Sequence, residues 1–104
     1  MDKILSLLGL ARRAGRLTLG FDAVCASVVK NESRLILTAA DVSEGTMRKL
    51  RNHLSGSEIN ITGIPFEQAQ INAAIGKPVR IISVNDSGFA NRIMELLDNG
   101  NGEE

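Results

Sequence analysis

The apolar residues of this chain alternate between two spacings, and this alternation restricts the possible folds more than any other feature. Leu35–Thr38 is a continuous apolar run bounded by polar residues, which is typical of a strand buried on both faces. Ile59–Thr62 alternates apolar and polar residues, as a half-buried strand does. Together with Arg16–Leu19 and Val79–Val84, these runs predict four strands.

Segments with helical spacing lie before, between and after the predicted strands. Asp2, Ser43 and Asp86 are placed to cap the starts of three helices, and Asn31 and Gly76 are suited to end two of the helices. The predicted helices cover about residues 3–13, 21–30, 43–54, 65–74 with Pro65 in the first turn, and 86–98.

The connections between these elements are only a few residues long. One sheet with helices on both faces accommodates this order of elements. We therefore predict an α/β fold with a single domain over residues 1–98 and a disordered tail over residues 99–104.

The charge of the chain excludes one class of nucleic-acid-binding protein. Twelve basic and twelve acidic residues give no net charge, whereas proteins that coat nucleic acid indiscriminately carry a large basic excess. Residues 1–53 hold nine of the basic and five of the acidic residues, a net charge of +4, which leaves −4 for the rest of the chain. This division is consistent with chance and also with a modest basic face opposite an acidic one.

Cysteine content and the first apolar run indicate the compartment. The single cysteine, Cys25, cannot form an internal disulfide, so a cytoplasmic location is expected. The apolar run near the start is too short to span a bilayer and is followed by Arg12 and Arg13, so we expect no membrane partner.

The residues that enzymes and metal sites need are sparse. His53 is the one imidazole and lies on a predicted amphipathic helix, where a surface position is expected. The sequence has no Gly-x-Ser-x-Gly elbow and no glycine-rich phosphate loop of the Walker or dinucleotide type. One cysteine and one histidine do not favour a zinc site, and Cys25 is interpreted as a small buried hydrophobe. We expect no enzyme, no catalytic residues, no metal or other cofactor, and no small-molecule substrate.

Two turns between a strand and a helix are suited to bind phosphate. Residues 18–20 and 40–43 each lead into a helix start, where free backbone N–H groups and the positive end of the helix point outward. The loop Ile75–Pro78 is both apolar and cationic, which suits stacking on an unpaired base. If the first two strands are neighbours in the sheet, basic side chains rim the surface beside these turns, namely Arg12, Arg13, Arg16, Lys30 and Lys49.

Several sequence blocks resemble those of a known family, in the family's order and spacing. The most specific block is LLGLARRAGRL at Leu7–Leu17, and LILTAADVS at Leu35–Ser43 follows it. The other matching positions are Gly20, Thr46, Lys49, AIGK at Ala74–Lys77 and SGFA at Ser87–Ala90. Over nearly its whole length, the chain resembles the YlxQ-type bacterial branch of the ribosomal protein L7Ae superfamily.

The resemblance implies a three-layer α/β/α sandwich around a mixed four-stranded sheet, and a non-enzymatic RNA-binding protein. Its better-known relatives recognise kink-turn RNA through a Gly-x-Asn-Glu-x-x-Lys motif at the start of the second helix, and the loop before the fourth strand packs on an extruded nucleotide. This chain keeps Gly20 but has Asp22, Ala23 and Ala26 in place of the asparagine, glutamate and lysine. Each lost contact weakens RNA binding by about 1 to 3 kcal/mol, so we expect an altered mode of binding.

Two functions remain open. In the first, the chain is a ribosome-associated protein that binds a structured RNA, with ribosomal RNA as a candidate, in a ribonucleoprotein. In the second, it is a protein-protein interaction module on the same fold, and Phe21 at the start of the second helix meets a partner protein or a second copy in a homodimer. The predicted RNA-binding residues are Gly20, Phe21, Asp22, Lys30, Asp41, Ser43, Thr46, Lys49, Ile75, Gly76, Lys77 and Pro78.

Overall fold

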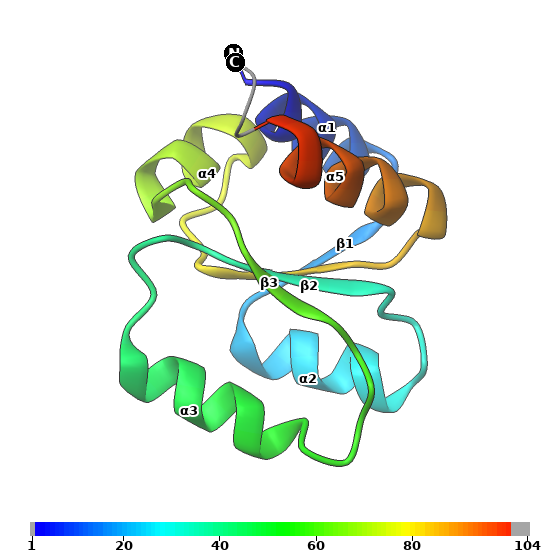
Figure 1. Cartoon of the computed structure of the whole chain (residues 1–104), viewed down its shortest axis with the longest axis vertical. Coiled ribbons are helices and arrows are strands. Elements are labelled where there is room, and N and C mark those ends of the chain that lie inside the picture. The colour runs from blue at the N-terminus through cyan, green and yellow to red at the C-terminus, as the bar shows by residue number, and fades with distance from the viewer. Residues whose placement is uncertain (1, 101–104) are drawn as a thin grey trace.

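The computed structural model describes residues 2–100. Within this range the chain forms five helices and a four-stranded sheet, in the order expected from the sequence (Figure 1). The helices are α1 (Lys3–Arg13), α2 (Phe21–Val29), α3 (Glu44–His53), α4 (Gln68–Ile75) and α5 (Ser87–Gly100). The strands are β1 (Leu17–Leu19), β2 (Leu35–Thr38), β3 (Ile61–Gly63) and β4 (Ile81–Val84).

The sheet is mixed, and its strands lie in the order β1-β4-β2-β3. β4 runs antiparallel to both β1 and β2, whereas β3 is parallel to β2. Val84 pairs with Leu17 on one side and with Leu35 on the other, so β4 separates β1 from β2. The first two strands are therefore not neighbours, so the strand order does not support the prediction that Arg12, Arg13, Arg16, Lys30 and Lys49 rim one surface.

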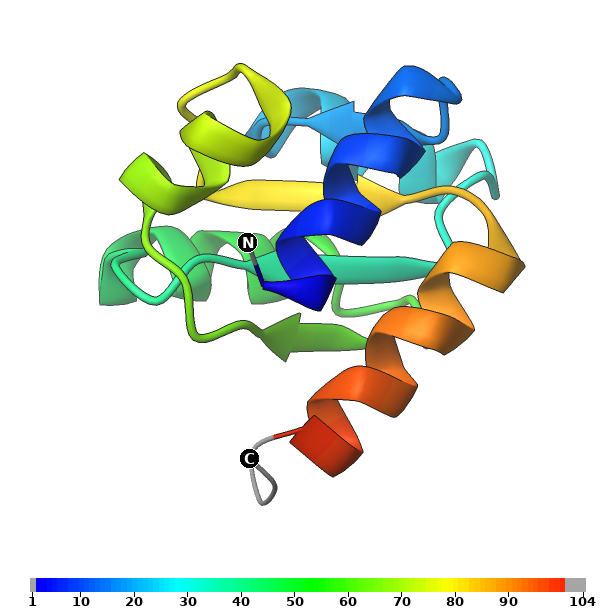
Figure 2. The same cartoon turned by 90° about the horizontal axis from the view of Figure 1, so that it is seen from above.

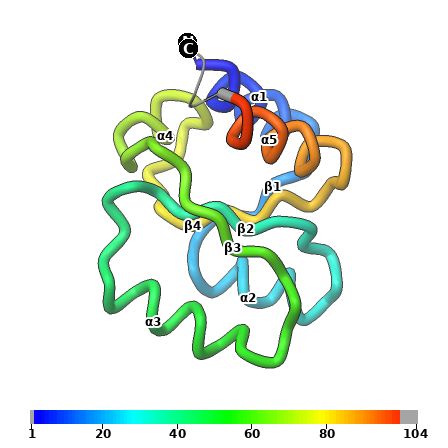
Figure 3. The backbone as a smooth tube through the Cα atoms, viewed as in Figure 1, coloured from blue at the N-terminus to red at the C-terminus, as the bar shows by residue number. Residues whose placement is uncertain are grey.

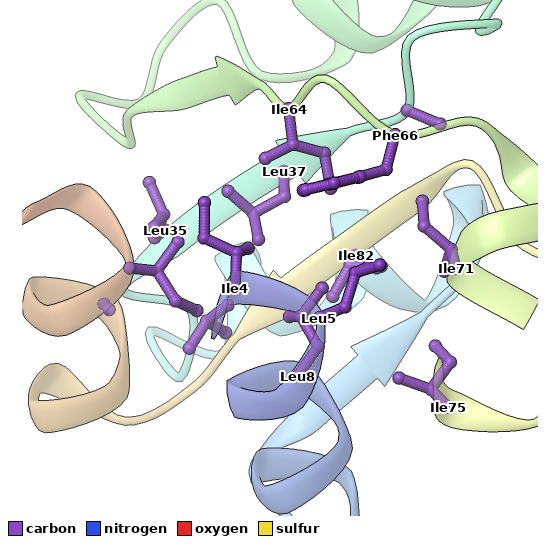
Figure 4. Close-up of a cluster of buried hydrophobic side chains, with 14 residues drawn as sticks. Ile4, Leu5, Leu8, Leu35, Leu37, Ile64, Phe66, Ile71, Ile75 and Ile82 are labelled. Carbon is purple, nitrogen blue, oxygen red and sulfur yellow. The ribbon is translucent and has the colours of Figure 1, made fainter. Parts of the chain in front are cut away.

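Helices cover both faces of the sheet and complete three layers. α1, α4 and α5 lie on one face, and α2 and α3 lie on the other (Figures 1 and 2). On the first face, the fully buried side chains of Leu8 and Ile71 belong to one cluster with Leu37 and Ile82 of the central strands (Figure 4). The second face has a smaller core of Val24, Ile36, Leu50, Leu54 and Ile81. The three-layer α/β/α sandwich with a mixed four-stranded sheet is thus confirmed.

The two central strands are buried along their whole length. Because neither face of β2 meets water, its sequence is a continuous apolar run rather than an alternating one. β4 contains one polar residue, Ser83, whose exposure is 0%. Its hydroxyl donates to Asn85 Oδ1 at 2.6 Å and lies 2.6 Å from Ser33 Oγ, so burial leaves no hydroxyl unpaired here.

Two helix boundaries differ from those expected. Pro65 lies between β3 and α4 rather than in a first helical turn, because α4 begins only after Glu67, whose N–H donates to Gln70 Oε1 at 3.0 Å. Asp86 caps α5 as expected, accepting the N–H of Phe89 at 2.9 Å. α5 then continues through residues 99 and 100, which the sequence assigns to the tail, while residues 101–104 of that tail lie outside the described range. None of the helices within residues 2–100 has the length and hydropathy to cross a bilayer.

Candidate nucleic-acid interface

The ends of β1 and β2 and the start of β4 meet at one edge of the sheet. Gly20, just after β1, donates its N–H to Ile81 O at 2.9 Å, and Ala39, just after β2, donates to Arg80 O at 2.9 Å. A hollow of about 530 Å³ lies at this edge, and we name its surface the ledge. The ledge is lined by Gly20, Phe21, Asp41, Val42, Ser43, Thr46, Gln68, Pro78, Val79, Arg80 and Ile81. The fold therefore brings together residues 20–21, 41–46 and 78 of the predicted RNA-binding set.

The start of α2 opens onto the ledge without a side-chain cap. Gly20 is the N-cap residue and has a φ of 92°, a conformation that glycine adopts far more readily than other residues. Since glycine has no capping side chain, the first N–H groups of the helix, at Phe21, Asp22 and Ala23, have no side-chain acceptor from the cap. These donors and the positive end of the helix suit a phosphate oxygen.

The start of α3, in contrast, is capped by its own side chains. Ser43 Oγ accepts the N–H of Thr46 at 3.1 Å, and the Ser43 hydroxyl donates to Thr46 Oγ1 at 2.9 Å. Both residues were candidates for RNA contact, and each hydroxyl oxygen keeps some capacity to accept a hydrogen bond. The start of α3 nevertheless has fewer free donors for an anion than the start of α2.

Asp41 joins three segments of the ledge. Its Oδ2 lies 3.2 Å from Arg80 Nε, and its Oδ1 accepts the N–H of Gln68 at 3.0 Å. The Gln68 side chain donates in turn to Pro78 O at 2.8 Å. Sequence reasoning missed Gln68 and Arg80, because no local motif marks them and only the folded chain brings them to Asp41.

The acid stability of the protein should depend on Asp41. Desolvation raises the pKa of its carboxyl group, but the hydrogen bond from Gln68 N–H and the hydrogen bond and charge of Arg80 outweigh this effect and hold the pKa below its usual value. Ionised Asp41 therefore stabilises the fold above its unfolded pKa of about 3.9, and this contribution is lost as the pH falls through the lower, folded pKa.

We expect the melting temperature of Asp41→Asn to fall less than that of the wild type between about pH 5 and pH 2, as measured by circular dichroism. Glu44→Gln is the matched control, because it removes a nearby carboxylate that forms no ion pair within residues 2–100. An Asp41→Asn variant with the full wild-type acid dependence would contradict this role.

The turn between α4 and β4 presents a cation and a proline. Ile75 is 7% exposed and belongs to the core, so its side chain does not stack on a base as the sequence suggested. Gly76 ends α4 with a φ of 80°, and its N–H donates to Asn72 O at 2.8 Å. Lys77 and Pro78 follow and are exposed. Of the side chains predicted to bind RNA at this turn, those of Lys77 and Pro78 are therefore the accessible ones.

Phe21 is half-buried and packs against α3. Its ring belongs to the second core and meets the ring of His53 edge-on, with the ring centroids 5.2 Å apart. His53 is exposed, as expected, and its Nδ1 lies 2.9 Å from Lys49 O. Lys49 precedes His53 by one helical turn, so it lies on the side of α3 that faces the start of α2.

The cysteine is poorly suited to nucleophilic chemistry. Cys25 is half-buried, and desolvation together with the charge of Asp22 raises the pKa of its thiol, which disfavours the reactive thiolate. Within residues 2–100, no group of three or more His, Cys, Asp or Glu side chains is arranged to hold a metal ion.

Lys30 lies at the opposite end of the sheet from the ledge. α2 runs back along the sheet from Gly20, and its nine residues span about 14 Å. The loop after α2 leads into β2, where Arg34 N–H donates to Val84 O at the far end of β4. Figures 2 and 3 show this loop and the turn before β4 at opposite ends of the sheet. Lys30 and Lys77 therefore do not share the single surface expected from the sequence.

Known proteins resemble this chain in both sequence and fold. The model of the Ribosomal protein L7Ae/L30e/S12e/Gadd45 family matches residues 2–93. "RNA-binding protein YlxQ" of Enterococcus faecium is 33% identical over 97 residues, covering 93% of each chain. The protein of the same name from Bacillus subtilis (strain 168) is 30% identical over 97 residues, covering 88% of this chain and 92% of its own.

Two solved structures have the same fold. A protein of unknown function from Bacillus halodurans has a TM-score of 0.84 at 33% identity, covering 95% of this chain and 100% of its own. A Giardia lamblia 15.5kD RNA binding protein has a TM-score of 0.69 at 14% identity, covering 94% of this chain and 88% of its own.

Proposed function

Because the chain belongs to the ribosomal protein L7Ae/L30e/S12e/Gadd45 family, we propose that it is a non-enzymatic protein that binds a structured RNA through the ledge. The observation that carries this proposal is the uncapped start of α2, which opens into the same hollow as Pro78. We expect Lys77, which precedes Pro78 in the chain, to contact the same phosphate backbone that these N–H groups hold. The names of the two YlxQ relatives support RNA as the ligand.

The proposed mode of binding differs from kink-turn recognition at three side chains. Asp22 accepts hydrogen bonds but donates none, and the side chains of Ala23 and Ala26 do neither. The backbone N–H groups of α2 and the charge of Lys77 do not depend on these side chains. We therefore expect kink-turn-like RNA to be held mainly through its backbone and shape, with weaker reading of the bases.

Ribosomal RNA in a cytoplasmic ribonucleoprotein is the target class that we propose. The family includes ribosomal proteins by name, which supports this choice. We also propose that residues 1–98 act as one RNA-binding domain, since the ledge is built from segments spread between Gly20 and Ile81.

Titration of two labelled RNAs tests the proposed function. We expect the wild type to bind a kink-turn RNA several-fold more tightly than an unrelated hairpin of equal length, and to bind both more weakly as salt rises. Lys77→Gln should weaken binding of both RNAs by a similar factor, because it removes a contact with the phosphate backbone of the RNA, which both RNAs share. Arg92→Gln on α5 removes the same charge far from the ledge and should have little effect. If the wild type binds neither RNA at low salt, the proposed function is wrong.

A protein-protein interaction module on the ledge is the second candidate, with a partner protein or a second copy as the occupant. The observation that favours it is the lack of excess positive charge on the ledge, because the two charged residues that line it, Asp41 and Arg80, form an ion pair.

Ala23→Arg distinguishes the two candidates, because it places a large cation at an exposed position at the start of α2. Tighter RNA binding by this variant, with unchanged sedimentation, favours RNA as the ligand. Loss of self-association or of partner binding, with RNA affinity unchanged, favours the protein module.

A further inference from the structure

The end of the sheet opposite the ledge concentrates positive charge. Val84 pairs with Leu17 and Leu35, so the residues before these two, Arg16 and Arg34, flank the end of β4. Because neighbouring strands lie about 4.8 Å apart, the Cα atoms of the two arginines are about 10 Å apart. Their places are fixed by the strand register rather than by flexible loops.

Other cations come from the two helices that end here. Arg12 and Arg13 form the last turn of α1, which leads into β1. Lys30 is the C-cap residue of α2, and the loop after it folds back, because Arg34 Nη1 donates to Asn31 O at 3.1 Å. We name this surface the basic end, and it consists of Arg12, Arg13, Arg16, Lys30 and Arg34.

A polar network beneath the basic end holds its turns in place. The hydroxyl groups of Ser33 and Ser83 are 2.6 Å apart, and both side chains are buried. Ser83 also donates to Asn85 Oδ1 at 2.6 Å, and Asn85 Nδ2 donates to Thr18 Oγ1 at 2.7 Å. The network connects β1, β4 and the loop before β2. A platform that is already ordered loses little conformational entropy when it binds an extended ligand.

The charge of the basic end is not neutralised within the described chain. Two carboxylates belong to the same end of the sheet, Glu32 in the loop before β2 and Asp86 after β4, so five cations and two carboxylates leave a net charge of +3. Asp86 is already engaged as the cap of α5. The two ion pairs within residues 2–100 are elsewhere, and Arg12 Nη1, which is itself buried, has no hydrogen-bond partner in this range. The basic end is therefore more positive than the ledge, where the charges of the lining residues Asp41 and Arg80 cancel.

The large apolar side chains exposed within residues 2–100 adjoin these cations. Val29, next to Lys30, is 85% exposed, and Leu10, one turn before Arg13, is 49% exposed. A nucleic-acid backbone offers phosphates to the cations and sugar faces to the apolar side chains. Such a mixed surface fits RNA better than it fits free phosphate.

We propose that the basic end binds the phosphate backbone of a second segment of the structured RNA, so that the chain bridges two RNA segments at opposite ends of its sheet. This inference rests on the proposed function, because it takes RNA as the polyanion. The molecule measures 36 × 27 × 26 Å, so the RNA needs a helical arm that extends beyond the segment on the ledge. The basic end recognises the charge of the RNA backbone rather than the bases, since none of its five residues has an aromatic side chain that could stack on a base.

Neutralising three exposed cations tests this proposal. The basic-end variant is Arg16→Gln/Lys30→Gln/Arg34→Gln. The matched control, Lys3→Gln/Arg51→Gln/Arg92→Gln, removes the same charge from exposed positions elsewhere. Because Arg34 also bonds to the Asn31 carbonyl group, a double variant that keeps Arg34 is tested in parallel, and thermal melting confirms that each variant is folded.

Each variant is titrated at several salt concentrations with a kink-turn RNA that has long helical arms, and with the same RNA cut to short arms. For the long-armed RNA, we expect the basic-end variant to bind about tenfold more weakly and to lower the slope of log Kd against log salt by about 2, whereas the control leaves both nearly unchanged. The difference in Kd between the basic-end variant and the wild type should be smaller for the RNA with short arms. Preference for the kink turn over a hairpin should persist, because the ledge is intact.

The outcomes separate this inference from the proposed function. Equal affinities and slopes for the basic-end variant and the wild type would overturn the bridge and leave RNA binding at the ledge standing. Binding of neither RNA by the wild type would overturn both. Binding of polyglutamate that the basic-end variant loses, with RNA affinity unchanged, would assign this surface to an acidic protein and overturn the proposal.

Discussion

Restoring the three family side chains at the start of α2 should strengthen kink-turn binding by about 100-fold or more. The variant is Asp22→Asn/Ala23→Glu/Ala26→Lys, and all three positions are exposed, so the substitutions remove no core contact. Asparagine supplies amide donors, glutamate an acceptor, and lysine a charge for a phosphate. Each contact contributes about 1 to 3 kcal/mol, and about 1.4 kcal/mol corresponds to a tenfold change in Kd.

Asn91→Lys provides the control for charge, because the restored variant also gains one net positive charge. Residue 91 is exposed on α5, away from the ledge. We expect the restored variant to gain affinity for the kink-turn RNA but little for the hairpin, as measured by fluorescence anisotropy. If it gains no more than Asn91→Lys, the start of α2 is not where the RNA binds.

Leu8→Ala should lower the free energy of unfolding by about 3 kcal/mol, a large part of the 5–15 kcal/mol that is usual for a domain of about this size. Leu8 is 0% exposed and joins α1 to the core that includes Ile82. Leu10 lies on the same helix and is 49% exposed, so Leu10→Ala is the same chemical change outside the core. We expect that control to cost about 0.5 kcal/mol or less in urea unfolding. A similar cost for both variants would contradict the burial of Leu8.

Strand prediction worked best where no side chain faces water. β2 has the predicted bounds, because burial on both faces makes all of Leu35–Thr38 a continuous apolar run. β4 begins two residues later than predicted, because Val79 N–H donates to Lys77 O in the preceding turn. Local hydrogen bonds of this kind leave no trace in the spacing of apolar residues, so the ends of strands are harder to predict than their centres.

The order of the strands was not predictable from this sequence. Apolar spacing indicates which residues are buried, but it does not say which strand lies beside which. β1 and β2 are separated by β4, which comes much later in the chain. The prediction for Lys30 was wrong for a separate reason, because α2 carries the chain from the ledge to the basic end.

The candidate site was predictable where a residue's role depends on the backbone. Gly20 opens α2 with a positive φ, and Gly76 ends α4 with another, as their positions between elements suggested. Side-chain roles were harder to predict, because they depend on partners distant in sequence. Asp41 bonds to Arg80 and Gln68, and the side chain of Ile75, the last residue of α4, lies in the core although the residues after it form an exposed loop.

NMR titration of the isotope-labelled chain with kink-turn RNA is the most direct test of the claim that the ledge binds RNA. We expect the largest amide shift changes at Phe21–Ala23, Asp41–Thr46, Lys77 and Val79. The basic end should respond as a second group when the RNA has long arms. Shift changes that leave the ledge unaffected at saturating RNA, or no changes anywhere, would contradict the account.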